Sequence, residues 1–391
     1  MNSAPLPLSQ ARVLDSSGAH APRLPLFELF PRLEQRLPHV SLGTFPTPVH
    51  KLLNLGKNLG LDKLYIKRDD LSGTVSGGNK VRKLEFLLGE ALQANAKEVM
   101  TAGFAGSNHA LATAIYAQKV GLRSTSMLMP QINAGYVRRN LLASYTYQAR
   151  LCHYKNLGHL CLGVIGQQVR GIIKNRTLPR FIPAGGSSPI GLVGYVNAAF
   201  ELRDQIVAGE IPEPDLIYVP LGSMGTASGL MLGLKAAGLK TRVIPVRVIE
   251  ERMASPKRML RLIRQTGRLL SKADPIFPHV TISEADLSIR NDCLGEGYAR
   301  FTEKAVKAAD LMRAKAGIVM NGAYSAKAFS ALLDDAERGL LEGKTVLFWN
   351  TYNSRDLSAA IADVDYHQLP RPFHRYFEED VQPLDRENPC P

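Results

Sequence analysis

One lysine, Lys80, stands at the start of an expected helix directly after two glycines, in the segment SGGNKVRKLE (residues 76–85). A lysine that forms a Schiff base with a carbonyl must lose its proton easily, and the nearby cations Arg82 and Lys83 favour the neutral amine. The two glycines would let the backbone lie close to a flat ring. The same segment also fits a glycine turn with an exposed lysine, so on its own it indicates amine chemistry only weakly.

A second segment, GFAGSNHALATA (residues 103–114), offers polar side chains at the start of another expected helix. Ser107 and Asn108 are good helix-capping residues, which is a sufficient structural explanation for either of them. The same helix start would also present free N–H groups and the positive end of the helix dipole to a substrate carboxylate. His109, next in the chain, fits a packed or cleft-lining side chain better than a catalytic one.

A third segment, GSMGTASG (residues 222–229), follows an apolar run and is rich in small residues. Small residues expose successive N–H groups at a helix start, which suits a phosphate. The segment lacks the GKS or GKT of a P-loop, so a nucleotide triphosphate is not indicated, and it does not match G-x-G-x-x-G either. A plain turn explains it equally well when it is judged alone.

These segments must be positioned by the elements around them, and from Leu64 onward the chain alternates short apolar runs with amphipathic helical patterns such as 83–95 and 107–121. Such alternation predicts parallel sheets covered by helices, with binding loops at the strand ends. The three segments and AGGSS (184–188) each follow an expected strand, so they could meet at one cleft. The expected strands are residues 64–67, 98–102, 124–129, 180–183, 215–220, 242–249 and 345–349.

The composition is that of an ordinary globular protein, with 391 residues of which 45% are hydrophobic and 21% charged. That length suggests two domains, and no run approaches the ~20 apolar residues of a membrane span. The four cysteines show no C-x-x-C pair or zinc spacing, and the nine histidines form no ligand cluster. We therefore expect no metal site and a reducing, cytoplasmic compartment.

The Pro- and Ala-rich N-terminal segment lacks the apolar centre of a secretory signal, which favours a loosely docked terminus over a targeting segment.

The net charge of +13 raises the possibility of a nucleic-acid or membrane-surface partner. The Lys and Arg residues are scattered, however, and only residues 252–268, with five Arg and one Lys, are notably dense. That run also contains Met253 and Leu260, which is typical of a helix with a solvated basic face. We therefore expect no nucleic-acid and no membrane partner, and a positive field that attracts anionic substrates and phosphate cofactors.

Taken together, the order of these segments resembles a known family. The lysine loop, the Ser-Asn loop, the Gly-Gly-Ser loop, the phosphate loop and a tyrosine-bearing segment follow one another as in fold-type II (tryptophan synthase β-like) enzymes, which use pyridoxal 5′-phosphate (PLP). Within them the chain is similar to the 1-aminocyclopropane-1-carboxylate (ACC) deaminase/D-cysteine desulfhydrase family. The resemblance runs from about Pro46 to Trp349 and is carried by KRDDLSG…GGNKVRKLEFLL, SNH, IPAGGSSPIGLVGY and GIVMNGAYSAKA.

The resemblance implies roles for individual residues. Lys80 would be the Schiff-base lysine, Asn108 would lie beside the 3′-oxygen of the cofactor, and Ser107 would lie near the substrate. Tyr298 and Tyr324 would be active-site tyrosines, although a core aromatic with a satisfied hydroxyl is the alternative for each. The phosphate and the rest of the cofactor would be held by Asn79, Lys83, Gly222, Ser223, Met224, Gly225 and Thr226. Further substrate contacts are expected from His109 and Tyr352.

Two departures from the family bear on the substrate. ACC deaminases carry a glutamate near the pyridine nitrogen directly after the second tyrosine, whereas this chain has Ser325. A hydroxyl there would leave the ring a weaker electron sink, which favours β-elimination over cyclopropane opening. Relatives also tend to carry a small HTGG-type loop where this chain has NTYNSRD (350–356). Arg355 in that loop could bind a second substrate carboxylate, although a surface ion pair explains it better.

The resulting prediction is an α/β protein with two open twisted sheets flanked by helices. A large PLP-binding domain would comprise residues 40–83 and 208–365, and a small α/β domain residues 84–207. Residues 1–39 would form an N-terminal extension and residues 366–391 a C-terminal tail.

The family resemblance implies that Lys80 removes the Cα proton of a small amino acid, most readily D-cysteine, which would yield pyruvate, sulfide and ammonia. ACC deamination, another D- or β-substituted amino acid, and PLP binding without turnover remain alternatives. The family also suggests a homodimer.

Overall fold

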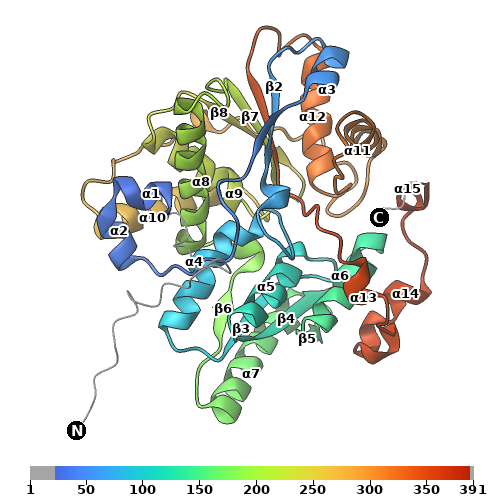
Figure 1. The fold of residues 1–391 in the computed structure, drawn as a ribbon. Coiled ribbons are helices and arrows are strands. Elements are labelled where there is room, and N and C mark those ends of the chain that lie inside the picture. Colours follow the sequence, from blue (N-terminus) through green and yellow to red (C-terminus); the bar gives the residue numbers. More distant parts are fainter. Residues whose placement is uncertain (1–22, 388–391) are drawn as a thin grey trace.

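The computed structural model describes residues 23–387, and the chain forms two sheets that lie one above the other in Figure 1. The N-terminal residues considered above as a targeting segment, and Cys390, lie outside the described residues. Within residues 23–387, no helix combines the length and the apolar composition that crossing a membrane requires.

The larger sheet has five strands in the order β1-β2-β9-β7-β8. Strand β1 is antiparallel to β2, and all the other pairs are parallel, so four strands end at the same edge. The parallel strands are buried along nearly their whole length, which explains their continuous apolar runs. The strands are β1 (Val49–Lys51), β2 (Leu64–Arg68), β7 (Leu216–Leu221), β8 (Arg242–Arg247) and β9 (Val346–Asn350).

Helices cover both faces of this sheet (Figure 1). One hydrophobic core joins it to α1 (Pro25–Leu29), α2 (Pro31–Arg36), α8 (Pro189–Val207), α9 (Gly225–Ala236) and α10 (Pro256–Ala273). A second core, on the other face, joins it to α3 (Leu53–Leu59), α11 (Glu303–Ala316) and α12 (Ser325–Glu337). The dense basic run seen in the sequence lies on and just before α10, which buries Met259, Leu262 and Ile263 and exposes its arginines.

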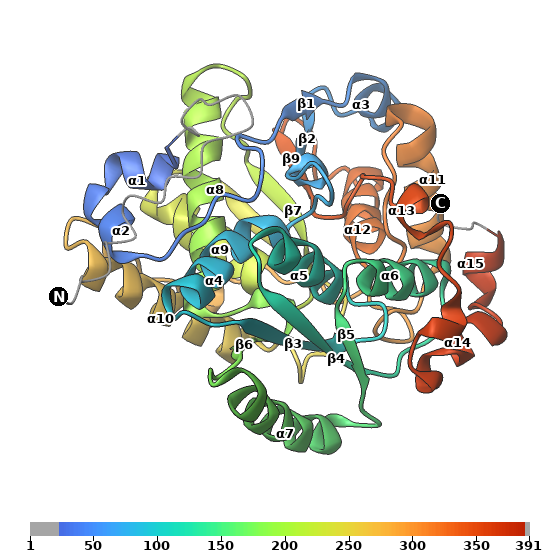
Figure 2. The same cartoon turned by 60° about the horizontal axis from the view of Figure 1, so that its bottom comes forward.

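The smaller sheet has four parallel strands in the order β5-β4-β3-β6. Figure 2 shows helices α4, α5 and α6 on one side of it and α7 on the other. The strands are β3 (Glu98–Phe104), β4 (Arg123–Met129), β5 (Arg150–His153) and β6 (Arg180–Ile182). The helices are α4 (Lys80–Gln93), α5 (Asn108–Lys119), α6 (Gly135–Thr146) and α7 (Leu157–Asn175).

All seven expected strands and both expected helices are confirmed within a few residues. Strands β1 and β5 were not predicted, because each is short and its partly exposed residues give no apolar run. The domain boundaries remain a proposal. Helix α8, which falls within residues 84–207, packs in the core of the larger sheet, while α4 packs with α5 beside the smaller one.

The segment after β9 returns to the smaller unit and packs beside α6 (Figure 2). Tyr376 anchors it, because its hydroxyl accepts a hydrogen bond from the Gln131 amide at 3.1 Å and its ring is buried. This segment contains α13 (Ser358–Ile361), short 3₁₀ turns at Tyr366–Gln368 and Arg371–Phe373, α14 (Arg375–Glu378) and α15 (Pro383–Glu387).

Candidate active site

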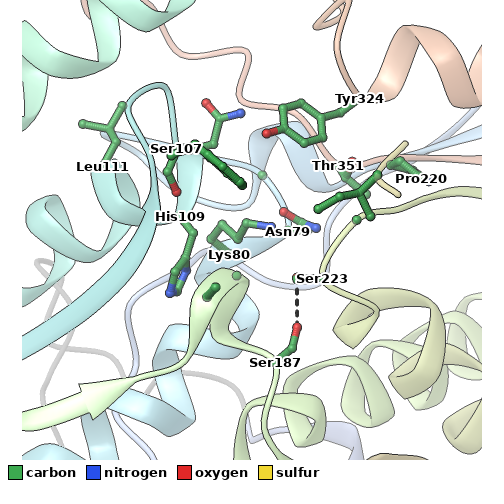
Figure 3. Close-up of a pocket in the computed structure, with 18 of the residues that line it drawn as sticks. Asn79, Lys80, Ser107, His109, Leu111, Ser187, Pro220, Ser223, Tyr324 and Thr351 are labelled. Atoms are coloured by element: carbon green, nitrogen blue, oxygen red, sulfur yellow. Dashed lines mark hydrogen bonds between the residues drawn. The ribbon is translucent and has the colours of Figure 1, made fainter. Parts of the chain in front are cut away.

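A cavity of about 830 Å³ lies where the loops at the carboxyl ends of both sheets meet. Parallel strands place these loops at one edge, so the segments after β2, β3, β6, β7, β8 and β9 all reach it. Figure 3 shows Lys80 near the centre, with Ser107 and His109 on one side, Tyr324 above and the Ser187–Ser223 pair below. The four loops singled out in the sequence therefore do converge.

Lys80 is the first residue of α4, and its side chain points into this cavity (Figure 3). Its amine makes no hydrogen bond with any residue that the structure describes. Burial lowers the pKa of Lys80 from 10.5 to about 8. About one amine in ten is therefore neutral at pH 7, and able to act as a nucleophile or a base.

The helix that carries Lys80 is fixed by a buried ion cluster beneath it. The Arg82 guanidinium donates to both carboxylate oxygens of Asp69, at 2.8 and 3.0 Å, and to Glu201 at 2.8 Å. All three side chains are at most 2% exposed. Burial opposes the charged forms, yet the partners dominate, so the pKa of Arg82 is raised and that of Glu201 is lowered to about 2.

Further buried groups complete the hydrogen bonding of this cluster. Lys67 donates to Glu201 at 2.6 Å, and the Tyr195 hydroxyl and the Trp349 indole both donate to Asp69 at 2.7 Å. The cluster thus joins β2, α4, α8 and β9 at the base of the cavity. Removing Arg82, which pairs with both carboxylates, would leave unpaired buried charges, which is far more costly than losing an exposed ion pair.

The NTYNSRD segment lies against the lysine loop rather than apart from it. The Gly77 amide donates to the Asn353 side chain at 2.6 Å, and the Asn79 amide donates to the Thr351 carbonyl at 3.1 Å. Gly78 has φ +91°, and a Cβ at this position would lie 2.9 Å from the Thr351 carbonyl oxygen, so only glycine fits between the two loops. Arg355 donates to the Gly73 carbonyl at 2.8 Å, a structural contact rather than the surface ion pair favoured from the sequence.

The loop after β7 forms a cradle with groups from two other segments, the AGGSS segment (184–188) and α4. Ser187 donates to Ser223 at 2.9 Å and accepts from the Gly225 amide at 3.1 Å (Figure 3). The Lys83 amine donates to the Gly185 carbonyl at 3.1 Å, and a Cβ on Gly225 would lie only 2.7 Å from that amine. The cradle therefore combines the free amides at the start of α9, two hydroxyls and an ammonium group, which together suit a phosphate.

Two further residues of the phosphate prediction support this cradle. The Asn79 side chain donates to the Thr226 hydroxyl at 2.9 Å, which ties the lysine loop to the start of α9. Met224 has φ +70°, an unusual value for a residue with a side chain, and it turns the chain just before α9.

The start of α5 faces the same cavity. Ser107 is its N-cap and accepts from the Ala110 amide at 3.1 Å, while the Asn108 side chain accepts from Asn140 at 2.8 Å. His109 is 2% exposed, and neither of its ring nitrogens has a hydrogen-bond partner among the described residues. Burial, with the positive charges of Lys80 and Lys83, holds the pKa of His109 well below its usual range, so its imidazole is neutral.

The two predicted tyrosines also meet here. The hydroxyls of Tyr298 and Tyr324 are hydrogen-bonded to each other, and both side chains line the cavity. Burial raises the pKa of Tyr298 to about 12, and burial also raises the pKa of Tyr324 well above its usual value. Both phenols therefore stay protonated and can donate hydrogen bonds. The Tyr298 ring also packs on Phe104, with ring centroids 4.6 Å apart.

Three predicted site residues lie behind the lining rather than on it. Ser325 is fully buried, and its hydroxyl accepts from the Asn321 amide at 2.9 Å. Lys83 and Gly225 do not line the cavity directly but adjoin it through the cradle. The other predicted residues are on the lining: Asn79, Lys80, Ser107, Asn108, His109, Gly222, Ser223, Met224, Thr226, Tyr298, Tyr324 and Tyr352.

Sequence reasoning missed several residues of the site. Ser187 stands in the AGGSS segment, so the motif itself could have shown it. Arg139, which donates to the Tyr352 hydroxyl, belongs to no motif. Asp69 and Arg82 lie within quoted motifs, but the pairing of Arg82 with Glu201 depends on a contact across 119 positions of sequence.

A group of potential metal ligands lies away from the cavity, although no metal site was expected. Single ligand atoms of Asp292, Cys293 and Asp334 lie within 4.8 Å of one another. Both carboxylates already have cationic partners, Arg290 for Asp292 and Lys304 for Asp334. These ion pairs explain the group without a metal.

This fold and cavity define a fold-type II PLP enzyme, and the comparisons with known proteins agree. The model of the pyridoxal-phosphate dependent enzyme family matches residues 40–351, so the chain belongs to that family. A protein of Pyrococcus abyssi, named provisionally as an ACC deaminase, is 31% identical over 82% of this chain and 92% of its own length. The D-cysteine desulfhydrase of Salmonella choleraesuis is 30% identical over 81% and 94%. The crystal structure of an ACC deaminase homologue, 31% identical, covers 85% of this chain and 95% of its own, with a TM-score of 0.71.

The residues present fit PLP. Because residue 225 is a glycine, no side-chain atom stands between its backbone, the Ser187 hydroxyl and the Lys83 amine, and the hydrogen-bond donors around this position suit the phosphate. The unpartnered ring nitrogens of His109 and the free amine of Lys80 face the same space. When bound, PLP supplies an aldehyde that combines with amines and a ring that withdraws electrons from the substrate Cα.

Proposed function

We propose that this enzyme is a D-cysteine desulfhydrase-like lyase, which removes hydrogen sulfide from a small amino acid by α,β-elimination. With D-cysteine and one water molecule, the products would be pyruvate, hydrogen sulfide and ammonia. The PLP-dependent family is common to this activity and to ACC deamination. The choice between the two rests on the site itself.

The observation that carries the proposal is the absence of any carboxylate from the cavity lining within residues 23–387. An acid beside the pyridine nitrogen would keep the ring protonated and make it a strong electron sink. Opening a cyclopropane requires that strong sink, whereas expelling a thiolate requires less. The hydroxyls of Thr351 and Tyr324 on the lining, and Ser325 behind it, are the neutral groups available instead.

Each role follows from the geometry of this chain. Lys80, with its lowered pKa, would take the Cα proton. The start of α5, with Ser107 and Asn108, would bind the substrate carboxylate through its free amides. The paired phenols of Tyr298 and Tyr324 would donate a hydrogen bond to the leaving sulfur or the carboxylate.

The test is the release of 2-oxo acid from D-cysteine and from ACC by PLP-loaded protein. We expect D-cysteine turnover to exceed ACC turnover by more than about tenfold, and Lys80→Ala to abolish it, because a missing general base typically costs ~10²–10⁴ in rate. Lys57→Ala, at an exposed lysine on α3, is the control variant. Faster turnover of ACC would identify a deaminase. A substrate-induced absorbance change without release of product would indicate a PLP-binding protein.

We also propose that the enzyme is a homodimer in the cytoplasm. The dimer rests on the family resemblance. The location rests on Cys152, Cys161 and Cys293, which are free thiols, as is usual in a reducing compartment. Light scattering on the purified protein and fractionation of cells test these two statements.

A further inference from the structure

Within the described part of the chain, every charged side chain on the cavity lining is a cation. They are Lys80, Arg139, Arg252 and Arg258. A cofactor phosphate at the cradle and a substrate carboxylate at α5 would lie near Lys80 and Lys83. Arg252, between β8 and α10, and Arg258, in the first turn of α10, come from a different part of the chain, and both are exposed, so they stand at the mouth of the cavity.

The segment that carries Arg252 is braced by hydrogen bonds to its backbone. The Arg258 guanidinium donates to the carbonyls of Arg252, at 3.1 Å, and Met253, at 3.2 Å. The buried Arg247 side chain donates to the next carbonyl, that of Ala254, at 2.9 Å. Arg258 and Arg247 therefore have a structural task, and the shape of the mouth is set before any substrate arrives.

Arg252 differs from the other two arginines on the lining. Its guanidinium has no hydrogen bond or ion pair with residues 23–387, whereas Arg139 contacts the Tyr352 hydroxyl and Arg258 braces the loop. The neighbouring Glu251 is exposed but is not on the lining. A guanidinium on a braced loop, facing a cavity without acids, is suited to bind an oxyanion.

The cavity is large, and the cofactor and the substrate share its space. The cavity volume of about 830 Å³ lies toward the upper end of the ~300–1,000 Å³ usual for ligand pockets. The lining includes apolar side chains from two segments: Leu157 and Leu160 of α7, and Ile249 and Met253, the last next to Arg252 in the chain. A hydrocarbon stretch would be buried against them while its polar end reached Arg252.

We propose that the preferred substrates are amino acids whose side chain extends beyond the β-leaving atom and ends in a carboxylate or another oxyanion, which Arg252 binds. This inference rests on the proposed function, with D-cysteine as the minimal substrate of the same site. For S-carboxymethyl-cysteine, the Cα–H and Cβ–S bonds break, the proton passes to Lys80, and thioglycolate leaves. One water molecule is consumed, and pyruvate and ammonia complete the products.

The experiment uses two isosteric ligands, S-carboxymethyl-cysteine and S-carbamoylmethyl-cysteine, each as both enantiomers. Binding to the PLP-loaded enzyme is followed by absorbance titration, which does not depend on turnover, and kcat/KM is measured separately. We expect the acid to bind about twofold to fivefold more tightly than the amide, as an exposed charge pair gives. The preference should shrink between 50 mM and 500 mM salt, because the contact is electrostatic.

Arg252→Gln should bring the acid-to-amide ratio close to one, whereas Arg264→Gln, at an exposed arginine of α10 away from the lining, should retain it. A ratio near one in the unmodified enzyme would overturn the inference. So would a PLP-loaded Arg252→Gln variant that kept the ratio of the unmodified enzyme, because another group would then bind the acid. Binding with the expected ratio but no elimination would support the inference and refute the proposed lyase activity.

Discussion

The pKa of Lys80 can be measured directly in the cofactor-free protein. Burial lowers it from 10.5 to about 8, so at pH 7 about one amine in ten is neutral, roughly 300-fold more than for an unshifted lysine. The shift corresponds to about 3 kcal/mol at most, because water can enter the cavity and solvate the ammonium. The cause is burial of the Lys80 amine, whereas the lowered pKa of Lys83 has two causes, burial and the neighbouring charge of Lys80.

Competitive acetylation between pH 6 and 10, read out by mass spectrometry at the Lys80 peptide, measures the fraction of neutral amine. We expect a midpoint near pH 8 in the cofactor-free protein, and the same midpoint within about 0.5 units in Lys83→Met, because burial is unchanged. A midpoint above pH 9.5 would refute the burial argument. A midpoint that rises toward 10 only in Lys83→Met would show that charge repulsion, as the sequence suggested, sets the pKa.

The same shift has a consequence for stability. Because the folded pKa of Lys80 lies below its unfolded value, the unfolded chain binds more protons between pH 8 and 10.5. The contribution of Lys80 to the unfolding free energy therefore rises with pH across that window. Urea unfolding of the cofactor-free protein should show a rise, relative to Lys80→Met, of at most about 3 kcal/mol. Parallel curves for the two proteins would contradict this linkage.

Arg82→Met should destabilise the protein by about 3–5 kcal/mol in urea unfolding, because Asp69 and Glu201 would be left as unpaired buried charges; a loss below about 1 kcal/mol would show that the cluster is not needed. Gly225→Ala should weaken PLP binding at least tenfold by equilibrium dialysis, because the new methyl group would lie 2.7 Å from the Lys83 amine; unchanged affinity would place the phosphate elsewhere. Asn353→Ala should cost about 1 kcal/mol and speed hydrogen exchange at the amide of Gly77, the lysine-loop residue that it binds; unchanged exchange would mean that the loop is held by other contacts.

Much of the fold could be read from the sequence, because its signals are local. Buried parallel strands appear as continuous apolar runs, and helices show a periodic pattern within one segment. The convergence of the loops after 64–67, 98–102, 180–183 and 215–220 also followed, since the carboxyl ends of parallel strands meet at one edge. The match to the PLP-dependent family confirms the cofactor prediction.

Other features depend on contacts that no local pattern encodes. The interpretation of Ser325 as a partner of the pyridine nitrogen remains a prediction, since its hydroxyl is bound to the Asn321 amide. The NTYNSRD segment was expected to reshape the rim, and the structure shows it also holding the lysine loop.

The sequence by itself determined the lysine, the phosphate loop and the strands that present them, because each is written in a few consecutive residues. Only the tertiary structure decided what supports and surrounds them. Arg82 meets Glu201 across 119 positions of sequence, and Arg252 reaches a cavity whose other walls come from distant segments. Such pairings depend on how whole helices and sheets pack, which one stretch of residues does not specify.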